Sequence, residues 1–131
     1  MIEFHLESRS GVPTYLQLVQ QVRQAVRLGI LHPGDQLPTV KEVVEQLAIN
    51  PNTVLRAYRE LDLEGIVEGK RGVGTFVADG QAPLPPDDVK ALRVSLRRWV
   101  ERARAAGLDD DALAALFGET VHPTSSISKV A

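Results

Sequence analysis

The fold is decided by residues 39–65, which read TVKEVVEQLAINPNTVLRAYRELDLEG. Two short helical patterns stand in this stretch, and only a few residues separate them. The first pattern begins at a capping box formed by Thr39 and Glu42. The second begins at Asn50, a good N-cap, with Pro51 at the first helical position. Two helices with so short a connection have the dimensions of a helix-turn-helix, whose second helix lies in the DNA major groove.

The second helix of this pair has two chemically different faces. At about 100° per residue, its apolar side chains gather on one side: Val54, Ala57, Tyr58 and Leu61. The opposite side carries Asn52, Arg56 and Arg59. Arginine can bind guanine or a phosphate, and asparagine can bind adenine or a phosphate, although a solvated polar face has the same pattern. Asn52 and Thr53 also lie in the first turn, where free backbone N–H groups favour a phosphate.

A β-hairpin is predicted directly after the two helices. Short β-branched runs at 66–69 and 75–77 flank a basic, glycine-rich segment at 70–74. A hairpin in this place forms a wing that reaches a neighbouring groove or the DNA backbone. The predicted DNA contacts of the wing are Lys70, Arg71 and the backbone around Gly72.

The residues before the pair predict an arm and another helix. Residues 2–6 alternate apolar and polar side chains, which predicts a short strand or arm with one apolar face. That face holds Ile2, Phe4 and Leu6. Thr14 and Gln17 have the spacing of a second capping box, at the start of a helix that stops at Gly29. The apolar face of this helix holds Tyr15, Leu18, Val19, Val22, Ala25 and Val26.

A proline-rich segment, DGQAPLPP, predicts a stiff, extended linker rather than packed structure. The predicted domains are a winged helix-turn-helix at 1–78, the linker at 79–86, a helical domain at 87–118 and a frayed tail at 119–131. In the helical domain, Asp87 or Asp88 can cap a first helix. Asp109 can cap a second, shorter helix.

These two helices cannot bury their apolar side chains by themselves. The residues concerned are Leu92, Leu96, Trp99, Leu113, Leu116 and Phe117. Pairing with a second copy would cover them and form a homodimer, while docking back on the winged helix is the alternative. A two-fold dimer presents two recognition helices to a pseudo-palindromic operator. A small-molecule effector of unknown identity, bound between these helices, is a further open alternative.

Composition excludes several classes of protein. The 131 residues, 44% hydrophobic and 24% charged, suffice for one compact core but not for a large enzyme. The absence of cysteine excludes disulfide scaffolds and Cys-ligated metals, and fits a reducing cytoplasm. The formal charge is -2, and residues 41–71 hold five basic and six acidic side chains, so DNA binding depends on a local patch. Neither a membrane span nor a signal peptide is predicted, which indicates a soluble cytoplasmic protein.

The sequence predicts no catalytic or metal site. His5, His32 and His122 lack metal-ligand spacing, and no Ser/His/Asp set can be assigned. The glycine-rich segment at 69–75 lacks the Gly-Lys-Ser/Thr ending of a phosphate loop. Three consecutive carboxylates at 109–111 lack the alternating spacing of a calcium loop and match a helix dipole. We therefore expect neither enzyme activity nor a cofactor.

Several blocks, in the same order, resemble the GntR family of winged-helix transcription regulators, and within it the short YtrA-like subgroup. The resemblance covers essentially Val12 to Ala78, and its blocks are GVPTYLQ at 11–17, PGDQLPTVKE at 33–42, INPNTV at 49–54, RAY at 56–58, Leu61, Glu64-Gly65 and GVGTFV at 72–77. The family position of Lys41 is usually an arginine that contacts DNA, so the resemblance implies a phosphate contact for Lys41. Leu55 stands where relatives carry small or polar residues, which leaves the operator sequence open.

Residues and resemblance together predict a DNA-binding transcription regulator, a repressor that binds its operator as a homodimer. We expect Asn52, Thr53 and Arg56 in the major groove. We expect Lys41 and Arg59 on phosphates. The resemblance alone implies repression of a nearby operon, often one encoding an ABC transporter. The alternative is a winged helix used for protein assembly without specific DNA binding, but the polar face of the second helix argues against apolar anchoring.

Overall fold

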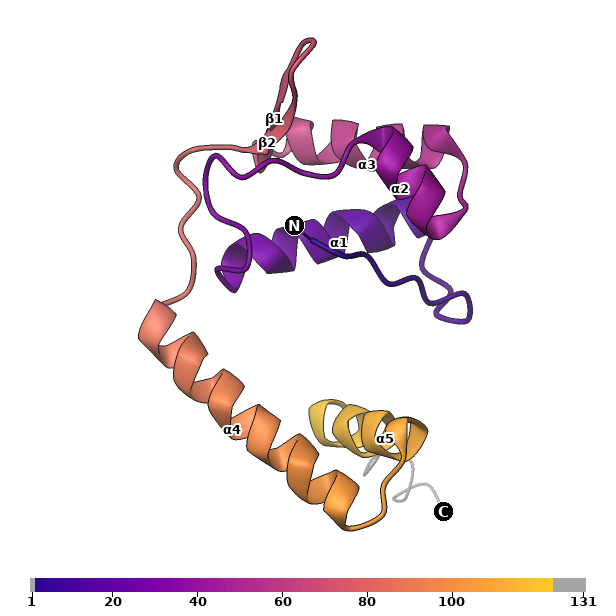
Figure 1. The fold of residues 1–131 in the computed structure, drawn as a ribbon, viewed down its shortest axis with the longest axis vertical. Coiled ribbons are helices and arrows are strands. Elements are labelled where there is room, and N and C mark those ends of the chain that lie inside the picture. The colour runs from indigo at the N-terminus through magenta and orange to yellow at the C-terminus, as the bar shows by residue number, and fades with distance from the viewer. Residues whose placement is uncertain (1, 124–131) are drawn as a thin grey trace. The chain divides into compact units, whose positions relative to one another are not determined.

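The computed structural model describes residues 2–123, which belong to two compact units with the boundary in the chain between Pro86 and Asp87 (Figure 1). The first unit contains α1 (Thr14–Arg27), α2 (Val40–Leu47), α3 (Pro51–Leu63), β1 (Val67–Lys70) and β2 (Gly74–Val77). The other helices are α4 (Pro86–Ala105) and α5 (Asp110–Val121). The predicted fold class, mainly α with a β-hairpin wing, is confirmed.

The core of the first unit lies between the apolar faces of α1, α2 and α3. Leu18 and Val22 of α1 and Val54 and Leu61 of α3 are fully buried, and so is Val43 of α2. Burying an aliphatic side chain of this size contributes roughly 1.5–3 kcal/mol. The core therefore fixes α3 on α1 through the faces that the helical periodicity predicts.

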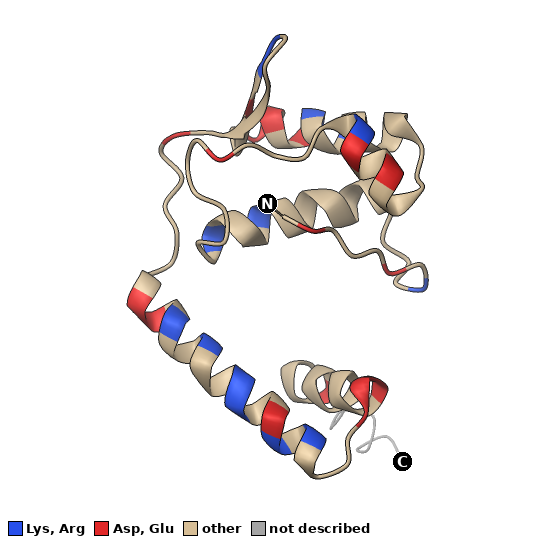
Figure 2. Ribbon diagram, viewed as in Figure 1, with Lys and Arg blue, Asp and Glu red and all other residues tan. Residues whose placement is uncertain are grey.

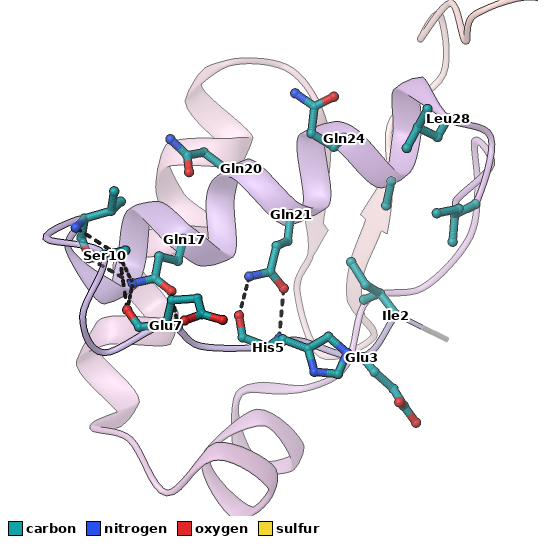
Figure 3. Close-up of a pocket in the computed structure, with 13 residues that line it drawn as sticks. Ile2, Glu3, His5, Glu7, Ser10, Gln17, Gln20, Gln21, Gln24 and Leu28 are labelled. Atoms are coloured by element: carbon teal, nitrogen blue, oxygen red, sulfur yellow. Dashed lines mark hydrogen bonds between the residues drawn. The ribbon is translucent and has the colours of Figure 1, made fainter. Parts of the chain in front are cut away.

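The N-terminal arm packs on α1 without forming a strand (Figure 3). Ile2 and Phe4 are buried, as their alternation predicts. Gln21 accepts a hydrogen bond from the N–H of His5 (3.0 Å) and donates one to its carbonyl (2.6 Å). Gln17 bonds the backbone of Glu7 in the same two directions, at 2.8 and 3.0 Å. Gln17 and Gln21 are four residues apart on α1, a rise of about 6 Å, which is close to the spacing of alternate residues in an extended chain. Their amides therefore bond the arm as a partner strand would.

The predicted capping box at the start of α1 is wrong. The N-cap is Pro13, and no side chain caps this helix end. Gln17 is buried and is used by the arm instead. The box at α2 is confirmed, because Glu42 N–H donates to Thr39 Oγ1 and Thr39 N–H to the Glu42 carboxylate. The hydrogen bond from the Thr39 N–H is the main reason that the pKa of the Glu42 carboxyl lies below its usual value, and the Thr39 hydroxyl adds to this effect.

The hairpin is bonded to the segment that leads into α2. β1 and β2 are antiparallel, in a register that pairs Val67 with Val77. Leu37 N–H donates to the carbonyl of Thr75 (2.8 Å), and Val77 N–H donates to that of Asp35 (2.8 Å). The hairpin therefore projects from the first unit with a fixed base (Figure 1).

Residues 79–86 belong to the first unit and are hydrogen-bonded to it, whereas the sequence predicted an unpacked linker. Gln81 Nε2 donates to the carbonyl of Gly65 (3.0 Å), and Leu84 N–H donates to that of Arg27 (2.9 Å). The reason is local: backbone carbonyls at the ends of α1 and α3 lack helical partners and accept these bonds.

In the second unit α4 and α5 form a helical hairpin. Asp109 caps α5, as predicted, by accepting from Ala112 N–H (2.8 Å). Asp87 and Asp88 lie inside the first turn of α4, so the predicted cap there is wrong; helix formation already begins at Pro86, which suits a first helical position. α5 continues to Val121, past the predicted boundary at 118, and the last eight residues of the predicted tail, 124–131, lie outside the described residues.

Candidate nucleic-acid interface

The two-faced pattern of α3 is confirmed. Val54, Ala57, Tyr58 and Leu61 are buried, and Asn52, Arg56 and Arg59 are exposed. Because the buried face packs on α1 and α2, the exposed face is held on a rigid support. The outward side chains offer arginine and amide donors, which suit base edges and phosphates. Their contacts with DNA stay predictions.

Tyr58 fixes α3 against the start of α2. Its hydroxyl donates a 2.6 Å hydrogen bond to the carbonyl of Pro38. Burial raises the pKa of Tyr58 well above its ordinary value, and the Glu42 carboxylate adds to this effect. The neutral phenol is therefore a dependable donor, and it sets the relation between the two helices of the helix-turn-helix.

The first turn of α3 is already hydrogen-bonded, contrary to the expectation of free N–H groups. Asn50 Oδ1 accepts from Asn52 N–H at 2.8 Å. Thr53 N–H donates to the carbonyl of Asn50 at 3.0 Å. The N-cap that starts the helix thus uses the groups that we expected to bind a phosphate. What this end of the helix still offers to an anion is the helix dipole and the side-chain donors of Asn52 and Thr53.

Arg56 contacts an aromatic ring that helical periodicity assigns only to the core. Its guanidinium carbon lies 3.7 Å from the ring centroid of Tyr15, the second residue of α1. The two side chains, together with others at the starts of α1 and α3, line an open hollow. The other residues of the hollow are Thr14, Asn50, Asn52 and Thr53. Nothing in the spacing of Tyr15 and Arg56 in the chain indicates this contact, which depends on how α1 crosses α3.

The wing carries its basic groups close to the hairpin turn (Figure 2). Lys70 is the last residue of β1, and its Nζ lies 5.1 Å from the ring centroid of Phe76 on β2. Arg71 and Gly72 are exposed in the turn, where Gly72 has a φ of +76° that favours glycine. Lys41 is exposed in the first turn of α2.

Acidic side chains near the end of α3 are used by the fold. Glu64 accepts a 2.6 Å ion-pair hydrogen bond from Arg23 of α1. Asp62 accepts a bond from the N–H of Gly69 on β1 (3.4 Å). The basic residues Arg56 and Arg59 stand nearer the start of the helix. These two carboxylates are therefore engaged within the first unit, whereas Arg56 and Arg59 are exposed.

An apolar surface remains exposed on α4 and α5. Trp99 and Phe117 contact each other with ring centroids 6.3 Å apart. Leu92 is 69% exposed and Leu96 47% exposed, and Leu116 and Phe117 are also exposed. Trp99 and Leu113 are half-buried. In the single chain, therefore, the helical hairpin covers only part of the predicted interface.

No helix within residues 2–123 is long and apolar enough to cross a membrane. Within the same range no three His, Asp or Glu side chains come together as a metal site. The side chains that do come together are the polar ones of α3, the basic ones of the wing and the apolar ones of α4 and α5.

A helix-turn-helix with a polar outer face and a basic wing defines the class of winged-helix transcription regulators. Residues 14–77 match the family model described as bacterial regulatory proteins, gntR family. The chain is 36% identical over 105 residues to the HTH-type transcriptional repressor YtrA of Bacillus subtilis, covering 79% of this chain and 81% of that protein. The chain therefore belongs to the gntR family of bacterial regulatory proteins, and its resemblance to the YtrA-like members is confirmed.

Solved structures agree with this assignment. A transcriptional antiterminator from Listeria monocytogenes aligns with a TM-score of 0.59 and 27% identity, covering 92% of this chain and 91% of that chain. The DNA-binding domain of AraR, in complex with operator ORX1, aligns with a TM-score of 0.52 and 25% identity. That alignment covers 59% of this chain and 96% of the AraR chain.

Proposed function

We propose that this regulator represses transcription by binding a pseudo-palindromic operator as a homodimer. α3 lies in the major groove, with Asn52, Thr53 and Arg56 toward the base edges. Lys41 and Arg59 contact phosphates on either side of the groove. The observation that carries the proposal is the exposed polar face of α3, backed from Val54 to Leu61 by a buried apolar face.

The wing adds contacts that do not depend on base sequence. Lys70, Arg71 and the backbone around Gly72 lie where a hairpin meets the DNA backbone or a neighbouring groove. The bonds between β2 and the segment before α2 support this role, because they give the wing a fixed position relative to the helix-turn-helix.

The exposed apolar surface of α4 and α5 supports homodimer formation. A second copy buries the same residues on both chains, which is the self-complementary contact of a two-fold dimer. Two copies then present two α3 helices, and their separation selects the spacing of the operator half-sites.

Fluorescence anisotropy with duplex DNA tests the proposal. The purified protein is titrated against the promoter upstream of its own gene and against a shuffled duplex, over a series of salt concentrations. We expect tight binding that prefers the promoter and weakens steeply with salt. Equal, weak binding to both duplexes, together with an empty selection from genomic DNA, would contradict it.

Arg56→Ala tests the recognition helix itself. The variant is expected to lose about 1–3 kcal/mol of operator affinity and to discriminate less between operator and shuffled DNA. If it binds the operator like the parent protein, the placement of α3 in the major groove is wrong.

A further inference from the structure

Tyr15 is absent from the predicted DNA contacts, yet its ring supports the guanidinium of Arg56 at 3.7 Å. We infer that Tyr15 is a positioning residue for DNA recognition, which orients Arg56 before DNA arrives. The inference rests on the proposed role of Arg56 in the operator complex. The start of α1 thus takes part in DNA binding, although α1 is not one of the two helices of the helix-turn-helix.

The ring leaves the hydrogen-bonding groups of Arg56 available. A guanidinium is planar and carries its five N–H donors along its edges. Stacking on Tyr15 occupies one face of that plane, so the edges keep the geometry for a bidentate contact with guanine or a phosphate. The structure records no ion pair for Arg56 within residues 2–123 that would compete for these donors.

The ring is itself well supported. Tyr15 is the second residue of α1, is half-buried and packs against the core cluster. The buried faces of α1 and α3 fix the two helices on each other. Tyr15 therefore forms a stable platform at the edge of the hollow that Arg56 and the first turn of α3 also line.

An arginine without such a platform loses more side-chain freedom when it binds DNA. Cation–π contacts at exposed sites are weak, so removing the ring is expected to lower operator affinity by about two- to fivefold. The loss should be confined to Arg56. Arg59 is exposed on the same helix and has no aromatic partner within the described residues, which makes it the matched control.

A double-mutant cycle on the full chain tests the inference. The proteins are the parent, Tyr15→Phe, Tyr15→Leu, Arg56→Ala and the Tyr15→Leu, Arg56→Ala double variant, titrated by anisotropy against the operator obtained by selection. Phenylalanine keeps the ring, so Tyr15→Phe is expected to stay within about twofold of the parent. Tyr15→Leu should weaken binding, and in the Arg56→Ala background it should have no further effect.

The control cycle pairs Tyr15→Leu with Arg59→Ala, and there we expect the two losses to multiply. Thermal unfolding of each variant checks that it is folded at the titration temperature. An NMR measurement without DNA keeps the test independent of operator binding. The ring of Tyr15 should shift the Nε–H proton of Arg56 upfield in the parent and in Tyr15→Phe, and the shift should disappear in Tyr15→Leu.

The outcomes separate the inference from the proposed function. If Arg56→Ala leaves affinity unchanged, the proposed role of Arg56 fails and the inference fails with it. If Arg56→Ala weakens binding but Tyr15→Leu does not, or if their losses multiply, the proposed function stands and the inference is overturned. Absence of the ring-induced shift in the parent protein also overturns it.

Discussion

The hydroxyl of Tyr58, on the buried face of α3, donates a 2.6 Å hydrogen bond to the carbonyl oxygen of Pro38, the residue before the N-cap of α2. This bond joins the recognition helix to the start of its neighbour. The segment that leads into α2 also bonds β2, because Leu37 N–H donates to the carbonyl of Thr75 and the carbonyl of Asp35 accepts from Val77 N–H. Tyr58 therefore links the positions of α2, α3 and the wing, the three elements from which the proposed DNA contacts come.

Tyr58→Phe is expected to lower the free energy of unfolding by about 1–3 kcal/mol. The ring still fills its place, but the carbonyl of Pro38 loses its donor in a buried position. Urea denaturation followed by circular dichroism measures the change. Tyr15→Phe is the control and should change stability little, because Tyr15 is half-buried and its hydroxyl has no hydrogen bond within residues 2–123. Equal stability of the two variants would show that the Tyr58 bond contributes nothing.

High pH should destabilise the protein through Tyr58. Burial, followed by the charge of Glu42, raises the pKa of this phenol in the folded state, whereas an unfolded tyrosine titrates near pH ~10. The raised pKa contributes stability that is fully present below about pH 10 and is lost as the pH rises above it, by at most about 1.4 kcal/mol per pH unit. Denaturation between pH 9 and about 11.5 should show a steeper decline for the parent than for Tyr58→Phe. Parallel declines would contradict this assignment.

Gln17→Glu should detach the N-terminal arm. Gln17 is only 8% exposed, and its Nε2 donates to the carbonyls of Glu7 (3.0 Å) and Val12 (2.9 Å). A carboxylate has no donor for these oxygens, so we expect a loss of roughly 3 kcal/mol at neutral pH. The loss should shrink in acid, where a protonated carboxyl can donate. Gln20→Glu, on the exposed face of α1, is the control.

Hydrogen exchange of the arm separates this prediction from a general loss of stability. Amides of residues 5–7 should exchange faster in Gln17→Glu than in Gln20→Glu, even where the rest of α1 stays protected. Unchanged protection of the arm would show that Gln21 and the buried Ile2 and Phe4 hold it without Gln17.

Lys70→Ala should weaken binding to all DNA sequences about equally. Lys70 lies on the wing, beside the ring of Phe76. In the proposed complex it contacts the DNA backbone rather than base edges. The logarithm of the binding constant falls with the logarithm of the salt concentration, and losing one phosphate contact should make this slope less steep by about 0.9. Anisotropy titrations of operator and shuffled duplexes measure both effects. Lys90→Ala, an exposed lysine of α4, should leave the slope unchanged; a specific loss on the operator alone would instead make Lys70 a base-reading residue.

Leu96→Glu should disrupt the proposed homodimer and leave a monomer. Leu96 is 47% exposed in the single chain and lies in the proposed interface, where a buried charge would have no partner. Sedimentation equilibrium measures the mass, and operator affinity should fall with it. Val94→Glu places the same charge on the opposite side of α4 and should stay dimeric. A monomeric parent protein would contradict the prediction at once.

The fold of the first unit could be predicted almost element by element. Periodicity located the buried face of α3, and the cap residues Thr39 and Asn50 marked where two helices begin. These signals are local, because a cap or an apolar stripe concerns residues within one or two turns. For the same reason local signals also misled: Thr14 and Gln17 have capping-box spacing, but Gln17 bonds the arm.

The sequence predicted which residues of the candidate site are exposed on α3, but not the contacts that these residues make with the rest of the first unit. The sequence placed Arg56 on the outer face of α3, but it assigned Tyr15 to the core and left the first-turn N–H groups free. The contact between Arg56 and the Tyr15 ring joins two helices that are distant in the chain. The N-cap Asn50 accepts the hydrogen bond of the Asn52 N–H, so this donor is not free. Contacts of either kind follow from the crossing of helices and from competition for hydrogen bonds, which residue spacing does not record.

By itself, the sequence determined the helices, the hairpin, the two-faced recognition helix and the family, because each depends on patterns along one segment. Only the tertiary structure decided how the segments support one another. It placed Tyr15 under Arg56, bonded Tyr58 to Pro38 and set two glutamines of α1 against the arm. The physical reason is that side-chain partners distant in the chain are chosen by packing: once the apolar faces of α1 and α3 are buried against each other, the polar groups at their edges bond whatever the packing brings within reach.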